Sequence, residues 1–252
     1  MISSNGDAED KYNIIMFFIA NKRNYKAMEE YSQWRLIGST HKEMTEEYTI
    51  DIKNENQRVS NEQRRNDRAR TLLEKFSKAH VYNEIDSEAY KQLLRLNVIE
   101  YNRLNDNKGV KFDFSIWDNK SLEHIYPKSM FFHTVVNEET QEIRYVRGDG
   151  ADISFDKTKD LRNSDTEFSN PSRYSEHCIG NLVLLYGKNN SEFSNLPFED
   201  KKFKFFHNER KFESRNLLHT ISSFASSKWD IEEIESSADS FIERFKKDYN
   251  IT

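Results

Sequence analysis

Apolar residues recur every three or four positions in three stretches of the N-terminal half, which is the spacing of one face of an α-helix. The pattern predicts helices over about residues 10–36, over residues 58–80 and around residues 90–101. Gly109 ends this pattern. We therefore expect a helical N-terminal region over residues 1–108.

After Gly109 the chain changes to short apolar runs separated by polar stretches. Residues 112–117 are aromatic and β-prone, and they lead into a strand that carries His124 and ends at Pro127. Residues 182–186 predict a short buried strand, and the polar residues 189–195 after it predict a short helix. The expected order of elements is strand, long loop, strand, helix.

The long loop between the two strands has a pattern of its own. Residues 137–160 are polar, and Gly148, Asp149 and Gly150 separate two stretches in which apolar and polar side chains alternate. Alternation on both sides of a turn signal is typical of a hairpin. We therefore predict a hairpin or mobile loop inserted into a module that spans residues 109–215.

The C-terminal region, residues 216–252, carries a further helical pattern. Asp230, followed three positions later by Glu233, forms a capping box, in which two side chains satisfy free N–H groups at a helix start. The apolar face of the predicted helix comprises Ile231, Ile234, Ala238, Phe241, Ile242 and Phe245. The fold class expected for the whole chain is α+β and mainly helical.

Composition narrows the class of protein. The 38 Lys and Arg against 43 Asp and Glu give a net charge of -5, so any contact with nucleic acid must be local. A single cysteine, Cys178, excludes an internal disulfide framework and paired zinc knuckles, and it favours a reducing, cytoplasmic setting. The most apolar run, residues 14–20, is too short for a membrane span of about 20 residues, so no membrane partner is expected.

A carboxylate, a histidine and two asparagines occur in an order that suits hydrolysis of a phosphodiester bond. Glu123 and His124 are adjacent on the predicted first strand, Asn181 opens the second, and Asn190 lies on the helix that follows. Neighbouring side chains on a strand point to opposite faces, so Glu123 can face a metal while His124 faces a water. A histidine with its ordinary pKa near 6.5 is mostly neutral near pH 7 and can accept that water's proton.

The metal in such a reaction neutralises charge on the phosphate and the departing oxygen, and hard oxygen donors bind it. The amide oxygen of Asn190 can join the carboxylate of Glu123 in an octahedral site for one Mg or Mn ion. Asn181 is placed to bridge backbone groups of the loop that holds His124, which would orient the imidazole.

These residues resemble the His-Asn-His (HNH) endonucleases of the ββα-metal fold. A closer resemblance, to the C-terminal HNH domain of GmrSD-type restriction enzymes and to HNH effectors of ATPase-linked antiphage systems, is carried by the stretches LEHIYPKS, IGNLVLLYGKNN and FEDKK. It extends over roughly residues 112–245 and includes Phe112 to Phe114, Ser214 and Trp229. The acid at Glu123, in place of the commoner Asp, and the Asn190 amide, in place of a histidine, favour Mg or Mn over zinc.

The resemblance implies a ββα-metal nuclease module flanked by α-helices, with His124 as general base and Asn181 as the residue that orients it. Glu123 and Asn190 would be the metal ligands. Contacts with nucleic acid are expected from Lys188, Lys201, Lys202 and His177. The implied substrate is DNA, and the implied role is the effector of a bacterial antiphage or restriction system. Because the chain has no P-loop motif, a separate ATPase or NTPase is the expected partner, docked on residues 1–108.

Two other functions fit the same residues, namely an RNA-cutting HNH toxin acting on tRNA and a non-catalytic nucleic-acid-binding or scaffold subunit that retains the HNH fold. Individual residues also have structural interpretations. A loop histidine such as His177 is more often structural than functional, and Cys178 is most simply a small buried apolar residue. The basic residues in 201–215 could lie on a nucleic-acid backbone, whereas the phenylalanines among them fit the core. The arginines in 58–70 fit a solvated helix face as well as a DNA or partner surface.

Overall fold

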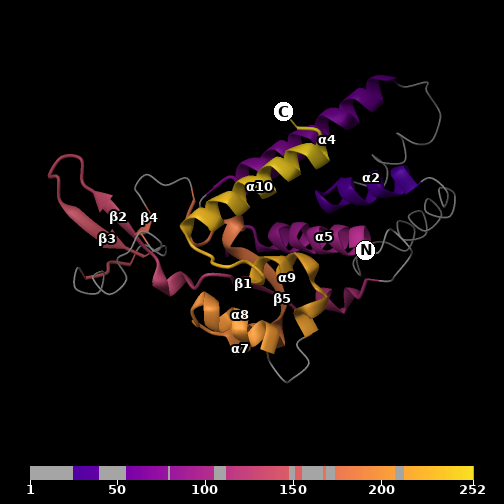
Figure 1. The fold of residues 1–252 in the computed structure, drawn as a ribbon. Coiled ribbons are helices and arrows are strands. Elements are labelled where there is room, and N and C mark those ends of the chain that lie inside the picture. The colour runs from indigo at the N-terminus through magenta and orange to yellow at the C-terminus, as the bar shows by residue number, and fades with distance from the viewer. Residues whose placement is uncertain are drawn as a thin grey trace. The chain divides into compact units, whose positions relative to one another are not determined.

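The computed structural model describes residues 25–39, 55–78, 80–104, 112–147, 151–154, 167–168, 174–207 and 213–251 (Figure 1). The chain divides into two compact units, of which one comprises Met1–Glu74 with Phe245–Thr252 and the other comprises Lys75–Arg244. The architecture is α+β and mainly helical, with small sheets, as predicted. Among the described residues, no helix combines the length and the apolar character that crossing a membrane requires.

Helices form where the apolar periodicity predicts them in the N-terminal half. They are α2 (Tyr25–Leu36), α4 (Glu55–Phe76) and α5 (Asp86–Leu104). Residues 10–24 of the first predicted helix lie outside the described residues. The carboxylate of Asp86 accepts a 2.7 Å hydrogen bond from the backbone N–H of Asn83, which fixes the turn that leads into α5.

The first unit is stabilised by contacts between α2, α4 and the last residues of the chain. The ring of Trp34 packs edge-on against Tyr249 with 5.3 Å between centroids, and the guanidinium of Arg65 lies 5.3 Å from the Trp34 centroid. The hydroxyl of Tyr249 donates to the carbonyl oxygen of Gln33 at 3.2 Å. Arg65 is buried, so at least this arginine of the basic stretch in α4 packs inside the unit rather than on a solvated face.

The second unit contains a pair of antiparallel strands, β1 (Lys120–His124) and β5 (Leu182–Tyr186), in the predicted places. The register sets Glu123 opposite Val183 and His124 opposite Leu182. All five residues of β5 are buried, because α5 and other helices of the unit pack against this strand pair. Helix α7 (Gly187–Phe193) starts directly after β5 and contacts both strands.

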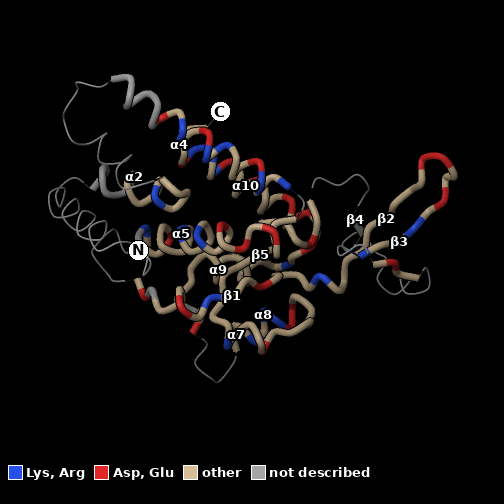
Figure 2. Tube along the Cα trace, turned by 180° about the vertical axis from the view of Figure 1, so that it is seen from behind, with Lys and Arg blue, Asp and Glu red and all other residues tan. Residues whose placement is uncertain are grey.

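A second sheet lies within the chain between β1 and β5. Strand β2 (Phe132–Val136) pairs antiparallel with β3 (Ile143–Val146) and parallel with β4 (Glu167–Phe168). The turn joining β2 to β3 begins at Asn137, whose side chain accepts from the backbone N–H groups of Glu139 and Thr140. This turn carries Glu138, Glu139 and Glu142, and its acidic tip is plain in Figure 2.

The β2–β3 hairpin precedes the turn for which the alternating pattern indicated a hairpin. The predicted turn at residues 148–150 lies outside the described residues. The residues flanking it do pair, since Val146 forms an antiparallel bridge with Asp152 and the backbone N–H of Arg147 donates to the carbonyl oxygen of Ala151 at 2.9 Å. Strand β3 thus ends in a residue, Val146, that takes part both in the β2–β3 hairpin and in this bridge.

The predicted β character of residues 112–117 is wrong, because a 3-10 helix occupies Phe114–Trp117. The carboxylate of Asp113 accepts a 2.9 Å hydrogen bond from the backbone N–H of Ser115 and caps this turn. The aromatic side chains raised the apparent β propensity, but a local cap decided the backbone conformation.

An aromatic cluster fills the core beside α7. Helices α8 (Phe198–His207) and α9 (Leu218–Phe224) contribute Phe205 and Phe224, whose rings lie 5.0 Å apart. Phe205 is fully buried, as predicted for the phenylalanines of this stretch, whereas Phe203 is 64% exposed and stacks on His207. The predicted core role therefore holds for Phe205 and not for Phe203.

Helix α10 (Ile231–Tyr249) begins at the predicted capping box. The backbone N–H of Asp230 donates to Glu233 at 3.2 Å, while the Asp230 carboxylate accepts from the N–H of Glu232 at 2.9 Å. Gly180 lies against the backbone of α10: a Cβ added there would lie 2.6 Å from the nitrogen of Ala238 and closer still to the carbonyl oxygen of Ile234. The residue before Asn181 must therefore be glycine for α10 to approach this closely.

Candidate functional site

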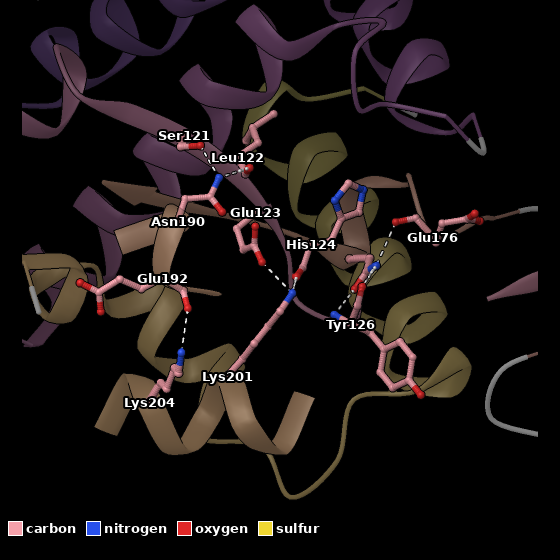
Figure 3. Close-up of polar contacts among 11 residues, drawn as sticks. Ser121, Leu122, Glu123, His124, Tyr126, Glu176, Asn190, Glu192, Lys201 and Lys204 are labelled. Atoms are coloured by element: carbon pink, nitrogen blue, oxygen red, sulfur yellow. Dashed lines mark hydrogen bonds and ion pairs between the residues drawn. The ribbon is translucent and has the colours of Figure 1, made fainter. Parts of the chain in front are cut away.

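The end of β1 places two candidate functional side chains next to each other. Glu123 and His124 are both buried, and their side chains leave the strand in different directions (Figure 3). This divergence follows from the alternation of side chains along a strand. One short strand can therefore present a carboxylate to one group of partners and an imidazole to another.

Lys201 of α8 is the direct partner of Glu123. Its Nζ donates to Glu123 Oε1 at 2.6 Å and to the carbonyl oxygen of His124 at 2.7 Å. Figure 3 shows the lysine side chain reaching from α8 to the end of β1. Lys201 is only 1% exposed, so this predicted phosphate contact lies inside the protein in the described structure.

Burial and charge act in opposite directions on this ion pair. Burial raises the pKa of Glu123, and the nearby ammonium of Lys201 offsets part of that rise. Burial lowers the pKa of Lys201, and the carboxylate offsets part of that fall. Each group therefore depends on the other to remain charged.

His124 lies among aromatic rings and a second histidine. Its Nε2 is 3.1 Å from Nδ1 of His177, and the ring of Tyr82 packs on it at a centroid distance of 4.5 Å. Burial lowers the pKa of His124 well below its ordinary value, and the neighbouring His177, Lys201 and Lys128 lower it further because they disfavour a positive charge on this ring. The imidazole is therefore neutral near pH 7, which is the form that can accept a proton.

A buried carboxylate, that of Glu176, lies near the ring nitrogen of His177 that does not contact His124. Glu176 Oε2 is 2.8 Å from Nε2 of His133 on β2, and Glu176 Oε1 is 3.9 Å from Nε2 of His177. Burial raises the pKa of Glu176, but the hydrogen bond from His133 and the proximity of the His133 and His177 rings outweigh it and lower the pKa overall. Glu176 is thus an ionised group in the interior.

The side chain of Asn181 connects three backbone groups around the site. Its Oδ1 accepts from the N–H of Tyr126 at 2.9 Å, while its Nδ2 donates to the carbonyl oxygens of Tyr126 and Glu176 at 3.0 and 2.9 Å. The carbonyl oxygen of Asn181 also accepts from the N–H of Ile125. This fully buried amide joins the segment after β1 to the segment before β5.

Asn190 of α7 lies on the Glu123 side of β1. Its Nδ2 donates to the hydroxyl of Ser121 at 2.5 Å and to the carbonyl oxygen of Leu122 at 3.2 Å. Because the nitrogen makes both of these bonds, the amide oxygen is turned toward the side of Glu123, as Figure 3 shows. The helix is anchored to the strand through the same side chain.

The donor set of this site suits a hard cation. The carboxylate of Glu123 and the amide oxygen of Asn190 are the oxygen ligands that Mg or Mn prefers, and waters and a phosphate can complete the coordination. Among the described residues, no group of three or more His, Cys, Asp or Glu side chains could hold a metal ion. A metal held by Glu123 and Asn190 would take its remaining ligands from water and phosphate oxygens.

The remaining predicted residues fall in different surroundings. His177 is buried beside His124, and Lys202 donates to the carbonyl oxygen of Ser226 at 2.6 Å. Lys188 is exposed on α7. Contact with nucleic acid stays a prediction for these residues and for Lys201.

Cys178 is buried, and burial raises the pKa of its thiol to about 12, in keeping with a structural role.

Sequence reasoning missed Glu176, His133 and Tyr82 as neighbours of the site. The adjacency of Glu176 to His177 was the available signal, because a carboxylate next to a histidine can fix its tautomer. Tyr82 precedes α5 and has no motif around it. The backbone N–H groups of Val81 and Tyr82 both donate to the carbonyl oxygen of His177, at 2.9 and 3.1 Å, which holds this segment against His124.

Comparison with known proteins adds one match. The family model described as GmrSD restriction endonucleases, C-terminal domain, matches residues 50–244, so the match begins earlier in the chain than the predicted resemblance did. No curated protein and no solved structure matches.

Proposed function

The chain belongs to the family of C-terminal domains of GmrSD restriction endonucleases, and from that premise we propose that it hydrolyses DNA phosphodiester bonds with one divalent metal as the nuclease of a restriction system. The proposed module is an HNH ββα-metal site built from β1, β5 and α7. Its proposed ligands are Glu123 and Asn190, and the proposed general base is His124. Mg or Mn is the proposed ion.

The strongest support comes from the end of β1. There a buried neutral imidazole and a buried carboxylate leave one strand in different directions, and the amide of Asn190 lies on the carboxylate side. Hydrolysis of a phosphodiester requires a base and a cation on opposite sides of one phosphorus atom. The divergence of Glu123 and His124 is the arrangement that meets this requirement.

The roles of the residues follow from their surroundings. His124 accepts the proton of the attacking water, since burial keeps its ring neutral. When bound, the metal supplies charge neutralisation at the phosphate and the departing oxygen. Glu123 and Asn190 hold that ion, Lys201 keeps the Glu123 carboxylate in place, and Asn181 holds the segment that follows His124.

A partner NTPase is the second part of the proposal. The chain has no P-loop motif, and the acidic tip of the β2–β3 hairpin is poorly suited to following a phosphate backbone. Recognition of the target and its trigger would then be supplied by a nucleotide-hydrolysing subunit. We propose residues 1–108 as the region that docks it.

A cleavage assay on the purified full chain tests the proposed activity. Duplex DNA and structured RNA are incubated separately with Mg, with Mn and with excess chelator, both alone and with the NTPase encoded beside it. We expect nicking or cutting of DNA that requires the metal and disappears in His124→Ala. Circular dichroism and DNA binding should be unchanged in that variant.

Each other outcome points to a different function. Cleavage confined to RNA would identify an RNA-cutting toxin and contradict the proposed substrate. DNA binding without cleavage under every condition would identify a non-catalytic subunit. Metal-dependent cutting that persists in His124→Ala would show that His124 is not the base.

A further inference from the structure

A line of four polar side chains extends from His124 through the buried Glu176 to His133, which is partly exposed. His124 Nε2 lies 3.1 Å from His177 Nδ1, His177 Nε2 lies 3.9 Å from Glu176 Oε1, and Glu176 Oε2 lies 2.8 Å from Nε2 of His133. The four residues come from β1, from the segment before β5 and from β2. The line therefore connects the second sheet to the proposed base.

Glu176 decides which atoms along this line donate hydrogen bonds and which accept them. It is only 1% exposed and ionised, and an ionised carboxylate can accept hydrogen bonds but cannot donate them. The hydrogen on His133 Nε2 therefore points at Glu176. The distance of 3.9 Å to His177 Nε2 is too long for a hydrogen bond, but the negative charge at that distance favours a proton on this nitrogen.

The tautomer of His177 then decides that of His124. When His124 and His177 are both uncharged, each imidazole carries one N–H, so a proton on Nε2 of His177 leaves its Nδ1 as an acceptor. The 3.1 Å contact between the two rings needs one proton, and His124 Nε2 must supply it. The unprotonated nitrogen of His124 is consequently Nδ1, which points away from His177.

His177 is held firmly enough to act in this way. Its backbone N–H donates to the hydroxyl of Ser175 at 3.1 Å, and its carbonyl oxygen accepts from the N–H groups of Val81 and Tyr82. The ring of His80 lies at a centroid distance of 5.2 Å from that of His177. Such surroundings fix a side chain before a substrate arrives.

We propose that His177, polarised by the buried carboxylate of Glu176, is a positioning residue that fixes His124 as the Nε2–H tautomer and so makes Nδ1 the nitrogen that accepts the proton from water. The catalytic part of this inference rests on the proposed nuclease function. The tautomer itself does not, because it can be observed in the resting protein.

The test is a long-range proton–nitrogen correlation spectrum of the full chain with ¹⁵N-labelled histidine, recorded near neutral pH. Comparison with His124→Gln assigns the His124 signals. In the wild-type protein we expect His124 to show a protonated Nε2 and an unprotonated Nδ1. His207, an exposed histidine on α8, provides the matched control in His207→Ala, which should leave these signals unchanged.

Three variants separate positioning from simple packing. Asparagine carries its amide oxygen close to the place of a histidine Nδ1, so His177→Asn should preserve the His124 tautomer and most of kcat. His177→Ala should give a mixture of the two His124 tautomers. It should also lower kcat by about a hundredfold with KM little changed, because a base that is not held in position is less often oriented to accept the proton. Glu176→Gln removes the charge and should also give a mixture of tautomers.

A wild-type His124 that carries its proton on Nδ1 would overturn the inference even if DNA is cut. Unchanged tautomer populations in both His177→Ala and Glu176→Gln would overturn it as well. If the protein proves inactive on every nucleic acid, the spectrum still decides the tautomer, so the two proposals fail independently. If His177→Ala does not fold, the wild-type spectrum and Glu176→Gln decide the question.

Discussion

The ammonium of Lys201 lies 2.6 Å from Oε1 of Glu123 in a region where both side chains are buried. It also donates to the carbonyl oxygen of His124, so one cation holds the carboxylate and the end of the strand together. Taking two charges out of water is costly, and their attraction offsets that cost only while both are present. The pair therefore makes each partner depend on the other.

Replacing Lys201 with methionine should destabilise the protein strongly. Lys201→Met leaves the Glu123 carboxylate buried without its cation, and breaking a buried pair in this way costs about 3 to 5 kcal/mol. The free energy of unfolding from urea titrations measures the loss. Because Glu123 would then be more stable when protonated, the deficit should shrink as the pH is lowered.

Lys204→Met on the same helix is the control, because this lysine is exposed and should change stability by less than about 0.5 kcal/mol. The double variant with Glu123→Gln should recover part of the loss. Equal stability of the two methionine variants would contradict the interpretation of Lys201 as the partner of a charged Glu123.

Asn190→Ala should raise the metal concentration that cleavage requires. The variant removes a proposed oxygen ligand, and loss of groups that merely support ligands already weakens metal sites by about 10- to 100-fold. Titration of Mg and Mn in the cleavage assay gives the half-saturating concentrations. Asn195→Ala, at an exposed position beyond α7, serves as the control. An unchanged metal requirement in Asn190→Ala would remove this residue from the site.

Gly180→Ala should lower the stability of the second unit. The new Cβ would meet backbone atoms of Ile234 and Ala238, which cannot rotate away as a flexible side chain could. Overpacking of this kind costs roughly 1 to 3 kcal/mol. In Gly187→Ala the nearest atom to the new Cβ is the carbonyl oxygen of Asn119 at 3.5 Å, so the thermal midpoint of that variant should stay close to the wild-type value.

The protein should lose stability as the pH falls from about 6.5 to about 4, in part through His219. Burial lowers the pKa of His219 to about 4, whereas a histidine in an unfolded chain titrates near 6.5. Between these values the unfolded chain binds a proton that the folded protein does not, so acidification favours unfolding. One such group contributes at most about 1.4 kcal/mol per pH unit.

Urea midpoints across this pH range, compared with those of His219→Gln, isolate the contribution. The variant keeps the backbone N–H that donates to Asn97 at 2.9 Å, but it has no group that titrates there. Its stability should fall less steeply with acidification. A slope identical to that of the wild type would show that His219 titrates normally in the folded protein.

Local pattern was sufficient to locate most of the regular elements. Residues 182–186 form β5 as predicted, because a short apolar run between Gly180 and Gly187 leaves few other conformations. The capping box at Asp230 and Glu233 also forms as predicted, since both partners lie within one helical turn. The family resemblance carried by the stretches around Glu123, Asn181 and Lys201 is also confirmed, because such a resemblance depends on the order of residues alone.

Prediction was wrong or incomplete where a local competitor or a distant partner took part. The cap of Asp113 turned a β-prone stretch into a 3-10 helix. The sequence pattern did not indicate the β2–β3 hairpin, whose strand β2 also pairs with β4, more than 30 residues further along the chain. Propensity is a weak guide whenever such pairings compete with it.

The sequence alone was thus enough to mark Glu123, His124, Asn181 and Asn190 as the candidate residues of one site. The tertiary structure alone revealed that Lys201 pairs with Glu123 across 78 positions and that His177 meets His124 across 53 positions. The physical reason is that local periodicity encodes secondary structure, whereas the partner of a buried charge or imidazole depends on which helices and loops pack around it. Lys201 illustrates this best, because its place in the sequence predicted a phosphate contact and its place in the fold is beside a carboxylate.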